Sequence, residues 1–598
     1  MTTELSSASL LAQAQAESEA NYDRTVREDI AKFREVAGKV AAGELTQDEF
    51  RPHRLRRGVY SQRQMGVHMI RTKIPGGIMT AEQMDVMAEV ADRWAAGKGH
   101  LTTRQNIQYH FVPLDEVANL LDRLADVRLT TREACYNTVR NVTASPLSGL
   151  LPNEVFDVTP HARISSLAFL HKELTDSLPR KFKIAFFAGG QEDDMALGMH
   201  DAGLTAVIRE VNGEKKRGFK VVIGGGLGPM PNEAALLDEF LPEEHLIPRL
   251  EAIIRLFNKH GNRNNKNKAR LKFVLRERGF QWVKDTIETE FADILANGGI
   301  PTPQHVPENF GGYQSTPPAL GNGAELPVLN AADPEYDRWL ETNIREQKQA
   351  GYAVVTVRTP QGNLTGDQMR GVAKIARQTG DSLVRVTIDQ NLQLGFIPLK
   401  NMKGVFAALK QIGLAEAGAG EIEDVTSCPG GYSCNLALTK SMNLGNALGQ
   451  ALAGYADKQV RAMHVKVSGC PNSCGQHWLG DIGFYGNARK INGQEVPYYQ
   501  LMLGGGNDRE GMLRYALAIH SIPAKLAPAA ARRVIDHFVV NRVAGESFRE
   551  YVLRHKVAFF KELTLDLAKP AEFTEDMHKD WGDDAGYSLQ LGRGECAA

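Results

Sequence analysis

An internal duplication constrains the fold of this chain more than any other feature of its sequence. Residues 67–114 align with residues 352–399 at a constant offset of 285, without a gap, and fourteen positions are identical. In the first copy these are Pro75, Gly77, Thr80, Gln83, Met84, Ala88, Ala91, Thr102, Gln105, Asn106, Gln108, Phe111, Pro113 and Leu114. Chance does not produce ungapped agreement of this density, so the chain is predicted to fold as two related halves.

Each copy has the pattern of a strand, a Pro or Gly turn, a helix and a second strand. The segments VHMIRTKI and YAVVTVRT alternate with the period of two that half-buried strands show. Thr80 and Thr365 stand where a helix N-cap belongs. After Thr80, the residues Met84, Met87 and Ala91 recur on one helical face. The segments NIQYHFVPL and NLQLGFIPL then indicate returning strands.

A weaker repeat follows each copy. The segments FKVVIGGGLGP and YQLMLGGGND match at an offset of 280, and each indicates a buried strand that runs into three glycines. The predicted fold class is therefore α+β, with two small modules and two larger α/β domains in a pseudo-twofold arrangement. The predicted boundaries are an N-terminal helical extension at 1–50, small modules at 51–125 and 345–412, larger domains at 126–310 and 413–598, and a linker rich in Pro, Gly and Asn at 311–344.

Composition limits where such a chain can act. A hydrophobic content of 42% and a charged content of 24% are those of an ordinary globular protein. The formal net charge of -1 provides no overall field that would attract nucleic acid or an anionic membrane. No apolar run is long enough to span a bilayer, and the N-terminus has neither the basic leader nor the apolar core of a signal peptide. We therefore expect a cytoplasmic protein without a nucleic-acid or membrane partner.

Four of the six cysteines are close together in the sequence, and all four are in the second half: Cys428, Cys434, Cys470 and Cys474. Their spacing, C-x5-C, then 35 residues, then C-x3-C, fits zinc knuckles poorly. Four thiolates suit an iron–sulfur cluster, which soft ligands favour. The Gly, Pro and Asn residues of SCPGGYSCN and SGCPNSCGQ allow backbone N–H groups to turn toward the sulfurs. Four buried cysteines without a metal are the alternative.

Basic residues of the first half form a second constellation. In KFKIAFFAG, Lys181 and Lys183 should lie on one face of a strand and Phe182 on the other. Arg71 and Arg104 have no basic counterpart in the second copy, where threonine and aspartate replace them. A site between the halves would therefore combine cations from the first half with a metal centre from the second.

The motifs around these residues resemble those of the nitrite and sulfite reductase family. The likeness is carried by TSCPGGYSCNLALTK, VKVSGCPNSCGQHWLGDIGFYG, MIRTKIPGGIMT and HLTTRQNIQYH, and it extends over about residues 50–560. The duplicated module is similar to the ferredoxin-like half domain of that family. The resemblance implies siroheme, one [4Fe-4S] cluster, and the six-electron reduction of sulfite or nitrite. The electrons would come from a separate donor protein, ferredoxin or a flavoprotein reductase.

The resemblance also implies a role for each candidate residue. Cluster ligands would be Cys428, Cys434, Cys470 and Cys474, with Cys474 bridging to the siroheme iron. Siroheme contacts would be Arg104, Gln108, His110 and Asn472. The oxyanion would be held by Arg71, Arg140, Lys181 and Lys183. A further basic run, Arg263, Lys266, Lys268, Arg270 and Lys272, either reaches a siroheme carboxylate or is an exposed helix start.

The motifs indicate different substrates. GCPNSCGQ and DIGFYG resemble the nitrite-reducing branch, but Lys183 is the sulfite-type residue at a position where that branch typically has asparagine. Tyr60 and Cys135 stand in motifs that some sulfite-reducing members join by a thioether, and an ordinary buried thiol is the alternative. We predict reduction of sulfite to sulfide, with reduction of nitrite to ammonia as the alternative. A non-catalytic iron–sulfur redox or regulatory protein is the alternative of another class.

Overall fold

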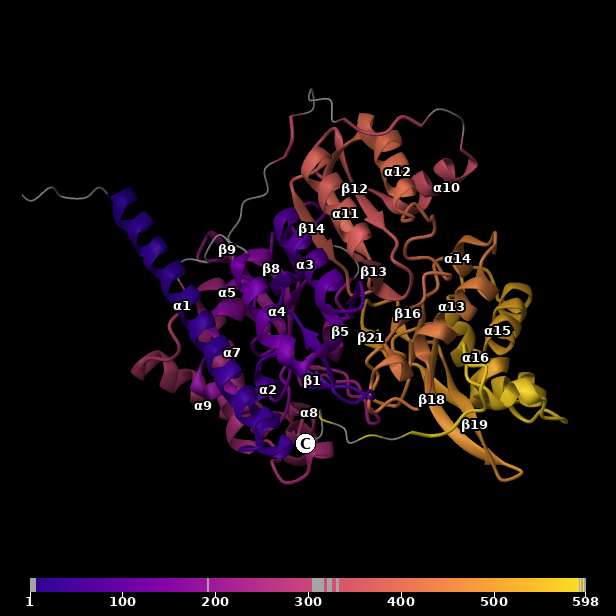
Figure 1. The fold of residues 1–598 in the computed structure, drawn as a ribbon. Helices are drawn as coiled ribbons and strands as arrows, with labels where there is room; N and C mark the ends of the chain where they lie inside the picture. The colour runs from indigo at the N-terminus through magenta and orange to yellow at the C-terminus, as the bar shows by residue number, and fades with distance from the viewer. Residues whose placement is uncertain are drawn as a thin grey trace, which may run out of the picture.

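The computed structural model describes residues 7–190, 193–303, 317–319, 325–329, 333–590, 592 and 595, with side chains from residue 22 onward. It contains four five-stranded sheets, and each half contributes the greater part of two of them, one in its small module and one in its larger domain. Figure 1 shows the first half in indigo and magenta packed beside the second half in orange and yellow. The predicted α+β class and the internal duplication are confirmed.

The two small modules contain the same elements in the same order. The first has β1 (Val59–Ser61), β2 (Val67–Arg71), β3 (Ile78–Thr80), α3 (Ala81–Trp94), β4 (Lys98–Leu101), β5 (Ile107–Pro113) and α4 (Leu114–Asp126). The second has β11 (Ile344–Glu346), β12 (Tyr352–Val357), β13 (Asn363–Thr365), α11 (Gly366–Thr379), β14 (Leu383–Val386), β15 (Leu392–Pro398) and α12 (Met402–Gln411). Both predicted N-caps are confirmed: Thr80 and Thr365 each form a capping box with the glutamine three residues later.

The modules exchange a short strand and therefore form one body. β13 pairs with β4 of the first module, and β3 pairs with β14 of the second. Two matching glutamines cross the boundary: Gln105 Nε2 donates to the carbonyl of Val386 at 3.0 Å, and Gln390 Nε2 donates to that of Leu101 at 2.8 Å. A single apolar core, which includes Met84 of α3, contains residues of both modules. The exchange brings the corresponding loops of the two halves together.

The two larger domains also share one topology. The first sheet has the order β10-β9-β8-β7-β6 and the second β16-β17-β18-β19-β22. The strands of the first domain are β6 (Thr143–Ala144), β7 (Ile184–Phe187), β8 (Ala202–Val211), β9 (Glu214–Ile223) and β10 (Ala235–Pro242). In the second they are β16 (Thr426–Ser427), β17 (Val465–Ser468), β18 (Ile482–Ile491), β19 (Gln494–Leu503) and β22 (Leu517–Pro523). The weaker repeat at an offset of 280 corresponds to β9 and β19.

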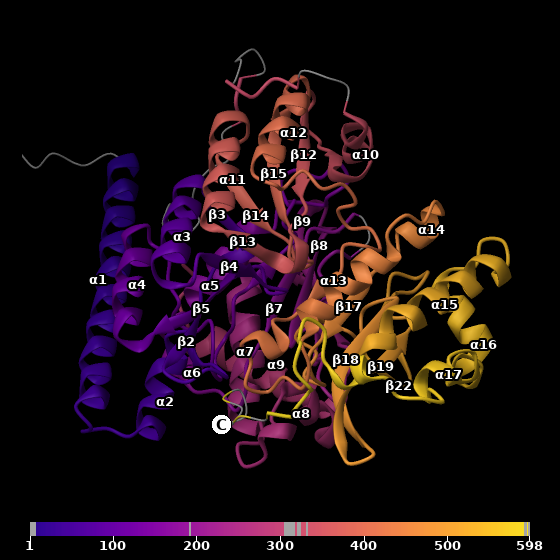
Figure 2. The same cartoon turned by 45° about the vertical axis from the view of Figure 1, so that its right-hand side comes forward.

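Helices complete each larger domain. α5 (Thr159–Ala168), α7 (Leu246–His260), α8 (Leu271–Arg278) and α9 (Phe280–Asn297) belong to the first, and α13 (Ser441–Leu452), α15 (Ala527–Asn541) and α16 (Phe548–Leu563) to the second. Figure 2 shows α15 and α16 beside the strands β18, β19 and β22. Each domain has its own apolar core, so the loops at the sheet ends project from rigid supports.

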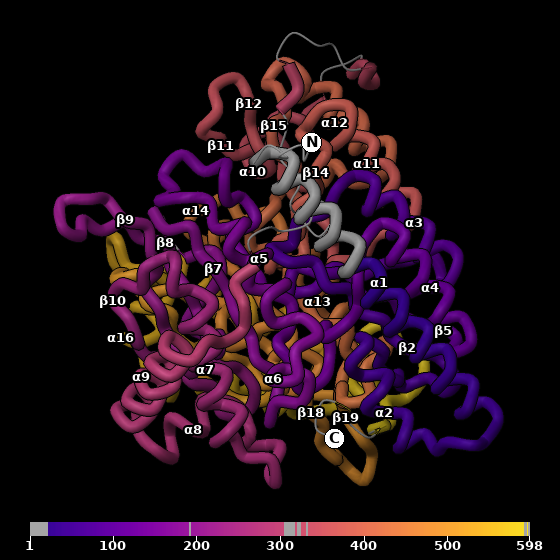
Figure 3. The backbone as a smooth tube through the Cα atoms, turned by 90° about the vertical axis from the view of Figure 1, so that its left-hand side faces the viewer, coloured from indigo at the N-terminus to yellow at the C-terminus, as the bar shows by residue number. Residues whose placement is uncertain are grey.

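The segments outside this duplicated frame are mainly helical. α1 (Ser7–Ala41) lies along α4, where Arg34 pairs with Asp122 at 2.6 Å, and it leads into α2 (Gln47–Arg56) (Figure 3). Much of the predicted linker lies outside the described residues, but its last part forms α10 (Pro334–Asn343), whose Trp339 is fully buried. Among the helices that the structure describes, none combines the length and apolar character needed to cross a membrane.

Candidate active site between the two halves

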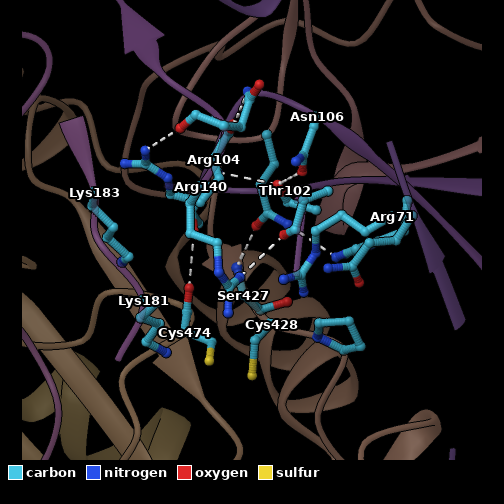
Figure 4. Close-up of a pocket in the computed structure, with 17 residues that line it drawn as sticks. Arg71, Thr102, Arg104, Asn106, Arg140, Lys181, Lys183, Ser427, Cys428 and Cys474 are labelled. Carbon is cyan, nitrogen blue, oxygen red and sulfur yellow. Dashed lines mark hydrogen bonds between the residues drawn. The ribbon is translucent and has the colours of Figure 1, made fainter. Parts of the chain in front are cut away.

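A cavity of about 90 Å³ lies where the two halves meet, and we call it the site cavity. Its first-half lining includes Arg71, Arg104, Gln108, Arg140, Lys181 and Lys183. Its second-half lining includes Gln390, Ser427, Cys428, Pro429 and Cys474. Figure 4 shows the labelled basic side chains gathered around one space with the sulfurs of Cys428 and Cys474. The predicted site between the halves is therefore present as a geometric arrangement.

Strand pairing positions the Arg71 side chain. Arg71 ends β2 and lies opposite Gln108 of β5. In the amide orientation that satisfies both groups, the Gln108 side-chain oxygen accepts a hydrogen bond from Arg71 Nε at 2.9 Å. The guanidinium also lies over the ring of Tyr60, 5.7 Å from its centroid. Neutral partners on two sides thus orient Arg71 without cancelling its charge.

A tightly turned loop holds Arg140 in a similar way. Arg140 Nε donates to the carbonyl of Tyr136 at 2.9 Å, and its Nη1 donates to the carbonyl of Ala134 at 3.1 Å. Tyr136 adopts a positive φ of 67°, which folds the loop so that these carbonyls face the guanidinium. These carbonyl groups orient the Arg140 guanidinium in the wall of the site cavity.

Lys181 and Lys183 both line the site cavity, whereas Phe182 between them is fully buried in the core of the first larger domain. The predicted alternation is confirmed, although the strand itself begins only at Ile184. Burial, with further contributions from Arg104 and other nearby cations, holds the pKa of Lys183 well below its usual range. An ammonium group in this setting gives up a proton more readily than an exposed lysine.

The four cysteines lie near one another on two loops of the second half. Burial is the largest cause that raises the pKa of the Cys470 thiol, and the proximity of the other three cysteine sulfurs raises it further. The backbone N–H of Gly469 donates to Cys428 Sγ at 3.2 Å, as the glycine-rich motifs predict. In the described part of the chain, no three Cys, His, Asp or Glu side chains converge tightly enough for a single metal ion. Four thiolates are a ligand set that iron–sulfur clusters use.

The residues of the first half fit an anionic cofactor as well as an anionic substrate. Within the described residues, Arg71, Arg104 and Lys183 form no ion pair with a carboxylate, although all three line the site cavity. Arg104 Nε and His110 Nδ1 are buried and have no hydrogen-bond partner among those residues. Buried polar atoms normally have partners, so such groups suit a carboxylate-rich ligand such as siroheme.

Several predicted site residues lie outside the lining of the site cavity. His110 is buried behind it, beside Tyr432 of the cysteine loop, and Asn472 is exposed while its backbone N–H points to Cys470. Tyr60 and Cys135 lie in one small apolar cluster. Tyr60 Oη accepts a hydrogen bond from Arg140 at 3.4 Å, so this cluster adjoins the site.

The second basic run divides into two parts. Arg263 and Lys268 are exposed, which agrees with the alternative of a solvent-facing helix start. Arg270 instead forms a buried ion pair with Asp201 at 2.7 Å, and Lys272 donates to the carbonyl of Leu227 at 3.0 Å. The run therefore does not act as one unit.

Sequence reasoning missed two buried groups that support the site. Asn141 Oδ1 accepts from the backbone N–H of Ile74 at 2.9 Å, and its Nδ2 donates to the carbonyl of Arg104 at 2.9 Å. Its position beside Arg140 in NTVRNV was the available signal. His200, which contacts Arg104, belongs to no motif, and only the fold reveals it.

Comparison with known proteins identifies the family. The model described as "Nitrite/Sulfite reductase ferredoxin-like half domain" matches residues 60–132 and 345–412, and "Nitrite and sulphite reductase 4Fe-4S domain" matches residues 135–295. Together these matches cover just over half of the chain. The chain belongs to the nitrite and sulfite reductase family. It is therefore an oxidoreductase whose cofactors are siroheme and a [4Fe-4S] cluster, and not the non-catalytic protein that was the alternative.

Relatives of this reductase have names of both kinds. A ferredoxin–nitrite reductase of Synechococcus elongatus is 29% identical over 74% of this chain and 80% of its own length. A ferredoxin sulfite reductase of Mycobacterium tuberculosis is 27% identical over 83% of this chain and 87% of its own length. The solved structure of the Mycobacterium tuberculosis NirA protein shares the fold, with a TM-score of 0.73, 24% identity, and coverage of 90% of this chain and 97% of that one.

Proposed function

We propose that this reductase converts sulfite to sulfide, using six electrons from a ferredoxin-type donor protein. The observation that carries the proposal is the pair Lys181 and Lys183 beside Cys474 in the site cavity, with Arg71 and Arg140 also in its wall. Several basic side chains around one cavity favour a doubly charged oxyanion over a singly charged one. The donor class follows the ferredoxin-dependent relatives of both names.

Different residues of the chain would bind the anion and supply the protons. Siroheme and the [4Fe-4S] cluster, held in part by Cys474, would supply the redox chemistry by which electrons from the donor protein reach the substrate. Arg71, oriented by Gln108, and Arg140, oriented by the carbonyl of Tyr136, would hold the anion and stabilise negative charge as it develops. Each sulfite oxygen leaves as water and requires protons, which Lys183 is suited to donate because burial has lowered its pKa.

The remaining assignments complete the proposed site. The cluster ligands would be Cys428, Cys434, Cys470 and Cys474. Siroheme would be contacted by Arg104, Gln108, His110 and Asn472. A cytoplasmic location remains part of the proposal. Tyr60 and Cys135 would form the thioether beside the siroheme, and their shared apolar cluster next to Arg140 supports this.

Nitrite is the second candidate substrate, because relatives with either name match this chain at similar identity. The test is steady-state kinetics of the purified protein with reduced ferredoxin and each anion. A higher kcat/KM for sulfite is expected. A clear preference for nitrite would reverse the choice of substrate, and absence of siroheme bands in the visible spectrum would overturn the whole proposal.

A further inference from the structure

His200 is a buried histidine beside the site that the proposed mechanism does not use. It lies in the turn before β8, and its side chain is fully buried. His200 Nε2 lies 2.6 Å from Arg104 Nη1, and His200 Nδ1 lies 3.2 Å from the carbonyl oxygen of Ala196. The ring therefore connects the cavity-lining guanidinium to the scaffold of the first larger domain.

The two partners determine the protonation of this ring. A carbonyl oxygen only accepts a hydrogen bond, so the proton must be on Nδ1. A guanidinium only donates, so Nε2 must be unprotonated. Burial, together with the nearby Arg104 and Lys183, also holds the pKa of His200 well below its usual range. His200 is thus a neutral acceptor in a neighbourhood of cations.

The neutral state of the His200 ring matters because it leaves the positive charge of the Arg104 guanidinium for a ligand. Arg104 Nη2 donates to the carbonyl oxygens of Asn141 and Ile184, the latter at 3.3 Å. Its Nε is buried and has no hydrogen-bond partner among the described residues. Each hydrogen-bond partner of the guanidinium in the described part of the chain is therefore uncharged. A carboxylate in place of His200 would hold Arg104 equally well but would cancel the charge that an anionic group needs.

The second half contains the same turn with a glycine in place of the histidine. Asp201 accepts from the backbone N–H of Lys183 at 2.8 Å, and Asp481 accepts from that of His464 at 2.8 Å, so the turn is duplicated. The residue before Asp481 is Gly480, where a Cβ atom would lie 2.6 Å from the carbonyl oxygen of Ile482. In the second copy, aspartate also replaces Arg104. The histidine and the arginine therefore occur together, in the cation-bearing half.

We infer that His200 is a positioning residue for Arg104, a neutral hydrogen-bond acceptor that fixes the guanidinium toward a carboxylate of the bound cofactor without reducing its charge. The inference rests on the proposed function, since it concerns the group that Arg104 contacts. His200 itself would touch neither substrate nor cofactor.

Three substitutions separate position from charge. His200→Leu removes the acceptor, His200→Gln retains a neutral one, and His200→Glu introduces a negative charge against Arg104. In His200→Leu we expect siroheme to dissociate about tenfold faster in mild urea, the effect of losing one charge-assisted hydrogen bond. His200→Gln should stay near the parent, and His200→Glu should lose siroheme fastest. Turnover per bound siroheme should stay within about twofold in His200→Leu and His200→Gln, because neither variant adds a charge near Lys183.

A double-mutant cycle tests whether the effect passes through Arg104. In an Arg104→Met background, His200→Leu should accelerate siroheme loss no further. The control is His161→Leu in the same domain, a buried histidine whose Nε2 contacts Glu243 at 2.7 Å, and it should retain siroheme as the parent does.

The outcomes distinguish this inference from the proposed function. Parent protein without siroheme bands or turnover would overturn the proposed function. A normal parent with His200→Leu indistinguishable from it, or additive losses in the cycle, would overturn only the role of His200. If His200→Leu does not accumulate as folded protein, His200→Gln and His200→Glu decide, and equal siroheme retention in these two would refute the requirement for a neutral acceptor.

Discussion

The first and second halves have one scaffold and opposite chemistry. At the end of the short strand β6 stands Ser145, and at the corresponding end of β16 stands Cys428. Ser145 Oγ donates to Asp194 Oδ1 at 2.8 Å, and Asp194 belongs to the loop between β7 and β8. The corresponding loop between β17 and β18 contains Cys474. A serine–aspartate contact in one half thus takes the place of a pair of cysteines in the other.

The cation position differs in the same way. Arg104 faces the site cavity, whereas Asp389 at the matching position forms an ion pair with Lys466 at 2.6 Å. At this position the two charges of the second half neutralise each other, whereas Arg104 forms no ion pair among the described residues. The two halves are therefore equivalent scaffolds, and each contributes a different part of one joint site.

The largest expected effect comes from the cysteine side of the comparison. Replacing Cys474 with serine should lower activity more than about a hundredfold if Cys474 is the proposed ligand, because a hard oxygen would replace a soft thiolate. Visible and EPR spectra should show loss of coupling between siroheme and cluster. Cys135→Ser is the control thiol and should retain the cluster spectrum. Full activity with unchanged spectra in Cys474→Ser would contradict the cluster assignment.

The next largest effect is expected at Lys183, one of the basic residues that the first half contributes to the site cavity. Lys183→Asn should lower kcat/KM for sulfite about a hundredfold, and that for nitrite clearly less, because asparagine neither neutralises a second charge nor donates a proton. His464→Asn is the matched control, since the backbone N–H of His464 meets Asp481 as that of Lys183 meets Asp201. Equal losses for both anions would remove Lys183 as the residue that separates the two substrates.

The serine–aspartate contact should make stability depend on pH. Burial, reinforced by Asp193, raises the pKa of Asp194 from 3.8 to about 7. The folded chain therefore binds more protons than the unfolded chain between these values, so the stability contributed below pH 4 is lost as pH rises through 7. Asp194→Asn should avoid a loss of about 2–3 kcal/mol between pH 5 and pH 8.

Apparent unfolding midpoints in urea at pH 5 and pH 8 measure this effect. The difference between the unfolding midpoints of the Asp194→Asn variant and the parent should increase with pH, with the variant becoming the more stable of the two. Asp508→Asn, at a half-buried carboxylate of the second half whose pKa is lowered, is the control, and its difference from the parent should not grow with pH in this direction. A difference that is the same at both pH values would show that Asp194 does not change its ionisation between pH 5 and pH 8.

The smallest effect concerns Tyr60 and Cys135, which have no counterpart pair in the second half. A thioether forms by an oxidation that removes two hydrogen atoms, so the joined tryptic peptides should be lighter than their sum by that amount. Cys135→Ser should lower turnover only about threefold, because the link positions a wall and contributes no charge. Complete alkylation of Cys135 in denatured, fully active enzyme would exclude the link.

The sequence by itself determined the repeated elements, the helix caps, and the cysteine and lysine positions, because each depends on local periodicity or on spacing along the chain. Thr80 and Thr365 cap their helices as predicted, and Phe182 is buried between two cavity-facing lysines. Only the tertiary structure decided which distant groups meet. The exchange of β3 and β13, the ion pair of Arg270 with Asp201, and the contact of His200 with Arg104 across 96 residues left no local pattern. Such contacts depend on how separate elements pack, and the propensities of neighbouring residues do not encode that packing.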